Sequence, residues 1–502
     1  MQKISQLYKE QNNMASTGQD ALWLGVDLGT TSVKAVLINQ YAETVSSSSL
    51  STSADVKSEI GSSGYEQNVL KIFSTIQNVV VPLIAEVKHN IKGIGVTGQM
   101  HGVVLWQNLF EGKQNSFLKI NESCCSHLFT WQDQRCSEDF IKTLPSSENS
   151  QTTLSTGHGC ATIFWLAKNK PTFFTDGNFT CCGTIMDLLV SVLCGLERPV
   201  TSDQLAASLG YYDESTQGWS SALSESSEFP CHLLPKIVPS GTPVGRVSSS
   251  HDDWPVDVPV YVGMGDVQCA MYALLKSHYD AAVNISTSIQ LGFIIANKDK
   301  EQVREESPPS ISFFPYFNDQ QLALCAGLNG GNAIQHFVEC VGQWFTDLET
   351  GFDIPPSLLL QKLLKLSQNA NSTDTLTFSP VFFGERHDPA STGHISGINS
   401  INFSNIGAIF RATCQGIVSH LHCMVPAKYL LDRGIQRLLL SGSVAVNNPV
   451  VKERLIELYT VPGELSVLVD LKESDAVASA AGAAKLVRDK MVDWNNGMGC
   501  NK

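Results

Sequence analysis

Short apolar runs alternate with longer amphipathic stretches from Ala21 onward. A short apolar run bounded by polar or glycine-rich turns predicts a strand, whereas apolar residues recurring every three to four positions predict a helix. The predicted strands are residues 24–26, 34–39, 91–97, 258–263, 281–285, 289–296 and 438–440, and the predicted helices are residues 68–87, 267–275, 406–421 and 476–487. We expect Pro82 to kink the first helix, because proline lacks the backbone donor. This alternation predicts sheets flanked by helices, an α/β fold.

Two predicted hairpins follow the same plan. In Leu24–Leu37 two strands flank a turn of glycine and hydroxyl residues, and in residues 281–296 two strands flank Ser286-Thr287-Ser288. We interpret the echo as two related α/β halves, each beginning with a hairpin that faces phosphate. The predicted division is a flexible extension (1–20), a first lobe (21–276), a second lobe (277–490) and a tail (491–502), with the ligand between the lobes.

Composition narrows the class of protein. The 502 residues are 43% hydrophobic, enough for two or more globular domains. The net charge of −14 argues against a large basic surface for nucleic acid, although it leaves room for a small anionic ligand. The 14 cysteines include no C-x-x-C pair, the N-terminal segment is polar, and no stretch reaches the roughly 20 apolar residues of a membrane span. We expect a reduced, cytoplasmic protein without membrane partners, either a monomer or a homodimer.

The first hairpin turn, Gly29-Thr30-Thr31-Ser32, carries the strongest chemical signal. Glycine lets the backbone approach a ligand, and successive N–H groups and hydroxyls can surround a phosphate. Asp27 stands at the strand end, where a carboxylate can hold Mg²⁺ through water. An ordinary β-hairpin with a polar turn is the alternative, and we favour the phosphate site.

Two segments combine residues that suit a polyol. Gln99 and His101 stand between Gly98 and Gly102, where they can hydrogen-bond sugar hydroxyls. The alternative is a tight turn with a satisfied histidine, which we slightly favour for this motif taken alone. Trp131-Gln132-Asp133-Gln134-Arg135 offers an aromatic face beside an acidic acceptor. The alternative there is a partly buried tryptophan beside a surface Asp–Arg ion pair.

Three later segments stand at predicted turns. Asp266, between a strand and a helix, fits either a general base or a helix N-cap. Gly442-Ser443 and Asn447 fit an adenine site or a common strand-to-helix turn. Gly384–Pro389 has the composition of a surface loop, with weak support for a role in closure.

Taken in order, these segments resemble the FGGY family of carbohydrate kinases over residues 21–490. The matching segments are Asp27–Lys34, Gly98–Gly102, Thr130–Arg135, Gly265-Asp266, Ser286–Ser288, Gly330–Gln335 and Gly442–Asn447. The resemblance implies two actin-like, ribonuclease H-like ATPase lobes that close on a sugar and ATP. We expect these opposing lobes to bring Asp27 and Asp266 to a shared site.

The resemblance also implies a role for each matching residue, with ATP and Mg²⁺ as cofactors. Asp27 lies near Mg²⁺, held through water, and Asp266 is the catalytic base that also touches the sugar. The residues that contact ATP are Thr30, Thr31, Lys34, Thr287, Gly331, Gln335, Gly442, Ser443 and Asn447. The residues that line the sugar pocket are Gln99, Met100, His101, Trp131 and Asp133. Three positions depart from the usual family pattern: Ser286 replaces a glycine, Ser443 replaces another, and Gln132 stands where many relatives have asparagine.

The expected reaction is ATP-dependent phosphorylation of a primary hydroxyl of a ketose, with sedoheptulose giving its 7-phosphate. A xylulose or other pentulose kinase is the alternative within the family. A sugar or nucleotide sensor without catalysis is an alternative of another class, although a pure binder needs neither Asp27 nor Asp266. An actin-like ATPase acting on a protein is a third, and it would have no use for the polyol segments.

Overall fold

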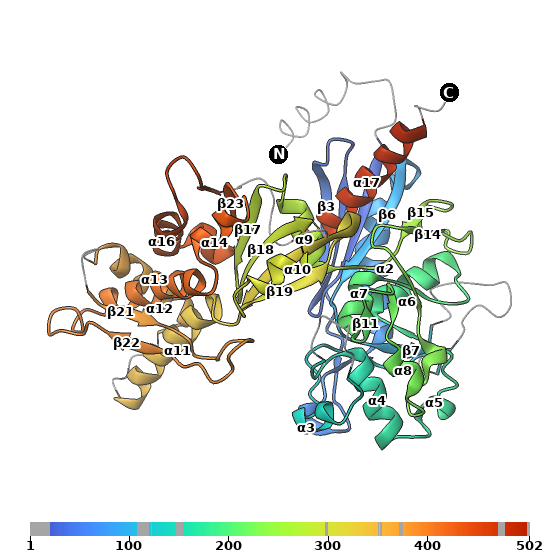
Figure 1. Cartoon of the computed structure of the whole chain (residues 1–502), viewed down its shortest axis with the longest axis horizontal. Coiled ribbons are helices and arrows are strands. Elements are labelled where there is room, and N and C mark those ends of the chain that lie inside the picture. The colour runs from blue at the N-terminus through green and yellow to red at the C-terminus, as the bar shows by residue number, and fades with distance from the viewer. Residues whose placement is uncertain are drawn as a thin grey trace.

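The computed structural model describes residues 21–107, 120–121, 123–146, 154–296, 300–349, 351, 354–370, 375–469 and 477–498. Two lobes lie side by side, the first mainly blue and green and the second mainly yellow and orange (Figure 1). Each lobe is built around one mixed sheet with helices on its faces, and each has its own apolar core. The fold is therefore the two-lobed α/β arrangement that the sequence predicts.

The first sheet has the order β14-β15-β6-β1-β2-β3, and β16 also pairs with β6. Its strands are β1 (Leu22–Leu28), β2 (Ser32–Ile38), β3 (Thr44–Ser51), β6 (Ile91–Gly98), β14 (Pro243–Arg246), β15 (Pro259–Tyr261) and β16 (Met264–Gly265). Strands β1, β2 and β3 run antiparallel, whereas β6 runs parallel to β1, β15 and β16. The carboxyl ends of β1, β6 and β16 therefore lie at one edge of the sheet.

The second sheet repeats this plan, with the order β19-β20-β18-β17-β23-β24. Its strands are β17 (Asp280–Ile285), β18 (Ile289–Ala296), β19 (Ile311–Pro315), β20 (Gln320–Gly327), β23 (Arg437–Ser441) and β24 (Ser466–Val469). Strands β17, β18 and β20 are antiparallel, and β23 and β24 extend the sheet in parallel beyond β17. The pairing confirms both predicted hairpins and the echo between them.

Helices cover these sheets and connect their strands. They are α2 (Val69–Ile84), α3 (Glu138–Lys142), α4 (Gly159–Asn169), α5 (Phe173–Asp176), α6 (Ile185–Cys194), α7 (Asp203–Leu209), α8 (Ser221–Glu225), α9 (Asp266–Leu274), α10 (Lys300–Glu305), α11 (Gly331–Asp347), α12 (Pro356–Gln368), α13 (Ile406–Met424), α14 (Ala427–Asp432), α15 (Ser443–Asn447), α16 (Pro449–Tyr459) and α17 (Ala478–Met498). Short strands outside the two sheets are β4 (Asp55–Val56), β5 (Glu66–Gln67), β7 (Val104–Trp106), β8 (Leu128–Phe129), β9 (Cys181–Gly183), β10 (Val200–Ser202), β11 (Tyr212–Asp213), β12 (Gly218–Trp219), β13 (Lys236–Val238), β21 (Thr377–Ser379) and β22 (His394–Ser396). Pro82 lies in the last turn of α2, which ends before the predicted boundary.

The C-terminal helix α17 returns to the first lobe, where it packs on β1 and β6 (Figure 1). A Cβ atom at Gly25 would lie 1.8 Å from the carbonyl oxygen of Ala480, and one at Gly95 would lie 2.5 Å from that of Ala483. The glycines of the sheet thus let an alanine-rich helix approach its backbone closely. The predicted second lobe, residues 277–490, includes most of α17, whereas in the structure α17 packs on the sheet of the first lobe.

Two further observations concern the whole chain. Within the described residues, none of the helices combines the length and the apolar character that a membrane crossing requires. The cysteines of the described residues are free thiols. The cytoplasmic location and the oligomeric state stay predictions.

Candidate active site

The end of β1 carries a buried acid–base pair. Asp27 lies opposite Lys34 in the β1–β2 register, and the Lys34 Nζ atom is 3.6 Å from the Asp27 Oδ2 atom. Only 4% of Asp27 is exposed. Burial raises the pKa of Asp27 above its usual range, while the charge and hydrogen bond of Lys34 oppose this rise. The carboxylate is therefore held at the sheet edge with a cation beside it.

Thr30 ties the first turn to three neighbouring polar side chains. Its hydroxyl accepts a hydrogen bond of 3.0 Å from the Trp131 ring N–H and donates one of 3.3 Å to the Gln99 side chain. The Gln67 amide donates to the Thr30 carbonyl at 2.8 Å and accepts from the Gln99 amide at 3.1 Å. Thr31 is exposed at the tip of the turn.

Gln67 is a site residue that the sequence reasoning missed. It is 1% exposed and also donates a 2.9 Å hydrogen bond to Asp55, so it joins the first turn to the strands beside it. A glutamine just before a helix carries no local signal of such a role. The signal comes only from the long-range contacts that fold it against Thr30.

Asp266 is the first residue of α9, directly after β16. In β6, Thr97 is the register partner of Asp27 on one side and of Met264 on the other. The two carboxylates thus stand at the same edge of one sheet: Asp27 lies near the end of β1, Asp266 follows the end of β16, and both strands pair with β6. The expectation that opposing lobes bring them together is wrong, because both belong to the first lobe and parallel strands end at a common edge.

The environment of Asp266 suits a group that exchanges protons near neutrality. Burial raises its pKa to about 7, and the negative charge of Asp27 contributes to this rise. The Val267 N–H donates a 2.8 Å hydrogen bond to the carboxylate, which opposes the rise, as does the charge of Lys34. Gly265 is the N-cap, so Asp266 is the first helical residue instead of the cap. A carboxylate with this pKa can accept a proton at physiological pH.

The segment Gly98–Gly102, which the sequence suggests for binding a polyol and which we call the polyol segment, turns sharply after β6. His101 has a φ of 72°, its backbone N–H donates to the Ser208 hydroxyl at 3.2 Å, and its Nδ1 atom lies 2.9 Å from the Ser208 carbonyl. Because a carbonyl oxygen only accepts, Nδ1 carries the proton, and Nε2 of the neutral ring is an acceptor. The ring stacks on His158 at 4.9 Å. Burial lowers the pKa of His101, the hydrogen bond that its ring donates to the Ser208 carbonyl opposes this, and the charge of Arg386 lowers the pKa further.

Gln99 and Met100 precede this histidine and are both buried. The Gln99 side chain accepts a hydrogen bond from Thr30 and donates one to Gln67. The polyol segment and the first hairpin turn therefore share one hydrogen-bond network. Sequence reasoning found these two residues but missed Ser208 and His158, which fix the histidine from distant helices.

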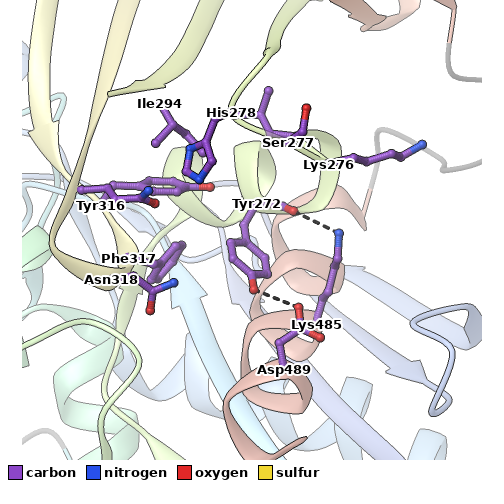
Figure 2. A pocket seen from close by; sticks show the side chains of 12 residues that line it. Tyr272, Lys276, Ser277, His278, Ile294, Tyr316, Phe317, Asn318, Lys485 and Asp489 are labelled. Carbon is purple, nitrogen blue, oxygen red and sulfur yellow. Dashed lines mark hydrogen bonds between the residues drawn. The ribbon is translucent and has the colours of Figure 1, made fainter. Parts of the chain in front are cut away.

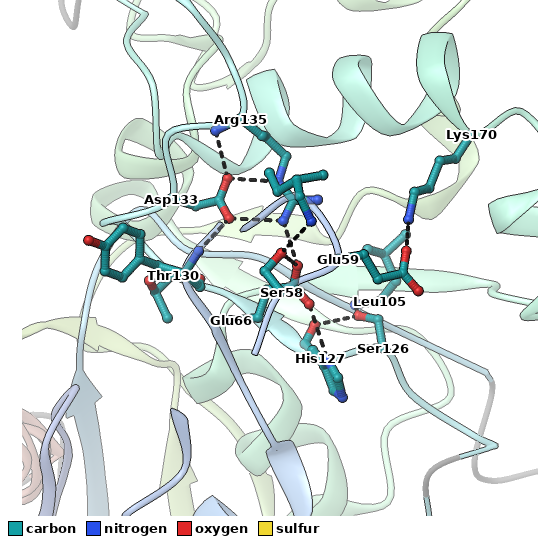
Figure 3. A network of polar contacts seen from close by, with 12 residues as sticks. Ser58, Glu59, Glu66, Leu105, Ser126, His127, Thr130, Asp133, Arg135 and Lys170 are labelled. Carbon is teal, nitrogen blue, oxygen red and sulfur yellow. Dashed lines mark hydrogen bonds and ion pairs between the residues drawn. The ribbon is translucent and has the colours of Figure 1, made fainter. Parts of the chain in front are cut away.

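Asp133 lies inside a polar network with Arg135 and Glu66 (Figure 3). It is 0% exposed, and its oxygens accept from the Tyr65 N–H at 2.9 Å and from the Arg135 guanidinium at 2.7 and 2.9 Å. Arg135 also donates to Glu66 at 2.8 Å and lies 4.3 Å from the centre of the Phe129 ring. Although burial acts against it, hydrogen bonds from neighbouring side chains lower the pKa of Glu66 to about 2.

The carboxylate of Asp133 is therefore engaged by Tyr65 and Arg135, and its expected place in the sugar wall stays a prediction. Both of its carboxylate oxygens are engaged, and the ion pair with Arg135 is buried rather than on the surface. Trp131 differs from Asp133, since 43% of its surface is exposed and its ring N–H reaches Thr30. The structure brings Trp131 to the first turn and leaves Asp133 as a support for the loop.

The second hairpin turn packs against the start of α11. The Gly331 N–H donates to the Ser286 carbonyl at 2.8 Å, and the Asn332 N–H donates to the Thr287 carbonyl at 2.9 Å. A Cβ atom at Gly331 would lie 2.2 Å from the Ser286 oxygen, so this position requires glycine. The side chain of Thr287 is exposed, as is Gln335 one turn further along α11.

The turn after β23 completes this edge of the second sheet. Gly442 has a φ of +90°, and a Cβ atom there would lie 2.4 Å from the Ile285 carbonyl oxygen. Ser443 and Asn447 are the first and last residues of α15, and both are exposed. The structure thus brings Gly442 and the second hairpin turn together, and Gly331 packs on the same turn.

A cavity of about 330 Å³ lies away from these residues, where α9 and α17 meet the turn before β20 (Figure 2). Its lining residues are Tyr272, Leu275, Lys276, Ser277, His278, Ile294, Tyr316, Phe317, Asn318, Gln320, Lys485 and Asp489. Tyr272 donates a 2.8 Å hydrogen bond to Asp489, and Lys485 donates one of 3.3 Å to the Tyr272 carbonyl. The cavity adjoins the end of α9 that is opposite Asp266, and none of the predicted site residues lines it.

Comparisons with known proteins agree with this arrangement. In the solved structures, a xylulose kinase from Rhodospirillum rubrum superposes with a TM-score of 0.73 at 18% identity, covering 93% of this chain and 89% of that chain. A Plasmodium falciparum glycerol kinase with ADP superposes with a TM-score of 0.71 at 19% identity, covering 95% and 91%. These likenesses show the fold.

Sequence comparison shows the family. The human protein "Sedoheptulokinase" is 37% identical over 459 residues, which cover 89% of this chain and 95% of that protein. The family model "FGGY family of carbohydrate kinases, N-terminal domain" matches residues 22–273, the segment that contains both Asp27 and Asp266. This chain belongs to the FGGY family of carbohydrate kinases.

Proposed function

We propose that this chain transfers the γ-phosphoryl group of ATP to a primary hydroxyl of a ketose, with sedoheptulose giving sedoheptulose 7-phosphate. Membership of the family makes the chain an ATP-dependent carbohydrate kinase, and the proposal names the acceptor. The 37% identity to the human sedoheptulokinase, over an alignment that covers 89% of this chain, supports that acceptor. The single observation that carries the mechanism is a carboxylate with a pKa of about 7 beside a second carboxylate at one sheet edge.

Asp266 is the proposed base. A sugar hydroxyl is a weak nucleophile at neutral pH, and a nearby carboxylate can orient it and accept its proton as the phosphoryl group arrives. The Val267 N–H fixes the carboxylate against the helix start, so its orientation costs little reorganisation. In-line positioning and neutralisation of charge supply most of the remaining acceleration in phosphoryl transfer.

The phosphate contacts are proposed for both hairpins. In the first lobe, Lys34 and the exposed tip of the Thr30-Thr31 turn face the phosphates. The proposed second-lobe contacts are Thr287, Gly331, Gln335, Gly442, Ser443 and Asn447. Glycine at 331 and 442 keeps the backbone close to the hairpin turn, so no side chain at these two positions stands between the turn and the nucleotide.

The carboxylate pair also fits Mg²⁺. Burial disfavours the ionised forms of Asp27 and Asp266, and the charge of Asp27 disfavours ionisation of Asp266 further, as their raised pKa values indicate. A divalent cation beside the two carboxylates would favour the ionised pair. Mg²⁺ is commonly held by one or two carboxylates, with water and substrate phosphates as its other ligands. Asp27 is the proposed holder, and the ion would neutralise charge on the phosphates of ATP.

The sugar contacts are proposed for Gln99, Met100 and His101, with Trp131 at the border of the first turn. The neutral His101 ring offers its Nε2 atom as an acceptor for a sugar hydroxyl, because Nδ1 is already bonded to Ser208. Closure of the lobes would exclude water and limit the hydrolysis of ATP.

A ketose panel tests the proposal. ADP release is measured for the purified full chain with sedoheptulose, xylulose, ribulose and glycerol, with and without MgATP, and ³¹P–¹³C coupling locates the phosphate on the product. We expect the highest kcat/KM with sedoheptulose and phosphate on carbon 7. A higher kcat/KM with xylulose would replace the acceptor with a pentulose. ATP hydrolysis that no sugar stimulates, or binding without turnover, would overturn the kinase proposal.

A further inference from the structure

The segment Thr156–Gly159 leads into helix α4 and contacts both of the regions that are proposed to hold the sugar. The Thr156 hydroxyl donates a 3.1 Å hydrogen bond to the Asp133 carbonyl. A Cβ atom at Gly157, which has a φ of +80°, would lie 2.1 Å from the Trp131 carbonyl oxygen. The first half of the segment therefore packs directly on the backbone of the loop that contains Trp131.

The second half of the segment packs on the turn that contains His101. The His158 ring stacks on the His101 ring, with 4.9 Å between the ring centres and 3° between the ring planes. A Cβ atom at Gly159 would lie 2.9 Å from the Cβ atom of Val103 and 3.2 Å from the His101 carbonyl oxygen. Glycine at this position therefore lets the start of α4 approach the polyol segment closely enough for the two rings to meet.

The His158 ring contributes a surface rather than hydrogen bonds at its inner edge. His158 is 8% exposed, and its Nδ1 atom is buried without a hydrogen-bond partner among the described residues. Burial lowers the pKa of His158 to about 3, with a further contribution from His101, so the ring is neutral at physiological pH. A flat, neutral ring is therefore what His158 presents to His101.

These contacts close a circuit through the first hairpin turn, because the Thr30 hydroxyl is hydrogen-bonded to Trp131 at 3.0 Å and to Gln99 at 3.3 Å. Gln99 belongs to the polyol segment with His101, and the segment Thr156–Gly159 leads from His101 back to Trp131. The relative positions of His101 and Trp131 are therefore fixed by two separate connections.

We propose that Thr156–Gly159 is a positioning segment of the sugar site, which sets the spacing between His101 and Trp131 and thereby selects among ketoses. This inference rests on the proposed sugar kinase function, in which these two side chains lie beside the sugar. Small displacements of groups that position a substrate have large effects on turnover. The segment acts through His101 and Trp131 and needs no contact of its own with the substrate.

The first test compares His158→Ala, which removes the stack, with His158→Phe, which keeps a flat ring without charge, and with His89→Ala, which removes an exposed histidine. We expect His158→Ala to raise the ketose KM about 2- to 10-fold, the factor for the loss of one aromatic pair. The ratio of kcat/KM between sedoheptulose and xylulose should move toward one, because the ring of His101 can tilt. The KM for ATP should stay unchanged, His158→Phe should recover most of the loss, and His89→Ala should match the wild type.

Gly157→Ala tests the other end of the segment, because the added methyl group must displace the Trp131 carbonyl. The matched control is Gly463→Ala, which has a φ of +81° and no atom within 4 Å of the added Cβ. Both variants carry the strain of a positive φ, so both should lose stability. Only Gly157→Ala should change the ratio of kcat/KM between the two ketoses, and an unchanged ratio would overturn the role of this end of the segment.

A spectroscopic measurement reads the positioning of His101 without turnover. In the wild type the ¹⁵N spectrum of its ring should show one tautomer, with the proton on Nδ1, as the contact with the Ser208 carbonyl requires. In His158→Ala the spectrum should shift toward the average of both tautomers, and His158→Phe should restore it.

Three results with His158 would overturn the inference. They are an unchanged ketose KM in His158→Ala, a rise of the ketose and ATP KM values together, and a failure of His158→Phe to recover the ketose KM. The second would indicate general damage to the lobe, and the third would mean that the imidazole itself contacts the sugar. If the wild type shows no ketose-dependent ADP release, the proposed function fails. An unchanged His101 spectrum in His158→Ala would still refute the positioning by itself.

Discussion

The two sheets begin with hairpins that share a register and differ in charge. In the first hairpin Asp27 lies opposite Lys34, and at the corresponding positions of the second hairpin Asn284 lies opposite Gln290. Both pairs stand one step before the last paired residues of their turn. The fold therefore provides the same place twice, and only the first place carries ionisable groups.

The two turns are also held by different means. Side chains of Gln67 and Gln99 support Thr30 in the first turn, whereas backbone N–H groups at the start of α11 support Ser286 and Thr287 in the second. We infer that the first hairpin carries the chemistry and the second provides a close-fitting surface. Substitutions in the first should lower turnover, and those in the second should weaken the binding of ATP.

The largest effect is expected for Asp266→Asn, which removes the proposed base beside the charged hairpin. Turnover with the best ketose should fall about 1,000-fold, within the range for loss of a general base, because asparagine cannot accept the hydroxyl proton. The KM values should change little, since the helix start and the Val267 N–H remain. Sugar-dependent ADP release at the wild-type rate would show that Asp266 is not the base.

The second largest effect on turnover is expected for Asp27→Asn, which places an asparagine in the first hairpin at the position that Asn284 has in the second. We expect kcat to fall about 100-fold, the scale for loss of one electrostatic contribution to the transition state. The matched change is Asn284→Asp, which keeps an acceptor for the Ser286 hydroxyl at 3.0 Å. It should raise the KM for ATP several-fold, by about 1 kcal/mol of repulsion, and leave kcat near that of the wild type. Equal losses of kcat in both variants would mean that both hairpins contribute to catalysis, which would contradict the inferred difference between them.

The pH dependence separates the two hairpins again, because only the first has a titrating partner. Burial raises the pKa of Asp266 from near 3.8 to about 7, so kcat/KM should rise with pH and level off above about 7, about tenfold lower at one unit below. The folded state binds the proton more tightly than the unfolded chain, so stability should fall as pH rises from 4 to 7. Asp266→Asn should lose that fall. The midpoint of the rate profile should move to lower pH in Asp27→Asn and stay in place in Asn284→Asp.

The spacing of apolar residues and the composition of the turns predicted the hairpins and strands that form between residues close together in the chain. The hairpins at β1–β2 and β17–β18 and the strand β6 follow from apolar runs beside hydroxyl-rich or glycine turns, and the structure has them close to the expected residues. The start of α9 after Gly265-Asp266 was predicted in the same way.

Long-range contacts account for what the sequence could not predict. Whether Asp133 faces solvent or Arg135 depends on how its loop folds over Tyr65, and the roles of Gln67 and Ser208 depend on strands and helices far away in the chain. The return of α17 to the first sheet likewise depends on its packing against Gly25, which lies more than 400 residues earlier in the chain, so no local pattern predicts it.

The smallest change in turnover is expected for Gly442→Ala, which tests the close fit of the second hairpin. Gly442 has a φ of +90°, and a Cβ atom there would lie 2.4 to 2.6 Å from backbone atoms of Ile285, so the turn must shift. The matched control is Gly434→Ala, with a φ of +77° and no atom within 4 Å of the added Cβ. Both variants should lose about 1 kcal/mol of stability to backbone strain, and Gly442→Ala should lose more. Because Asp27 and Asp266 lie in the other lobe, kcat at saturating ATP should stay within a few-fold of the wild type while the KM for ATP rises only in Gly442→Ala. A loss of kcat without a change in the KM for ATP would mean that the second hairpin takes part in the chemistry, and the contrast between the two hairpins would fail.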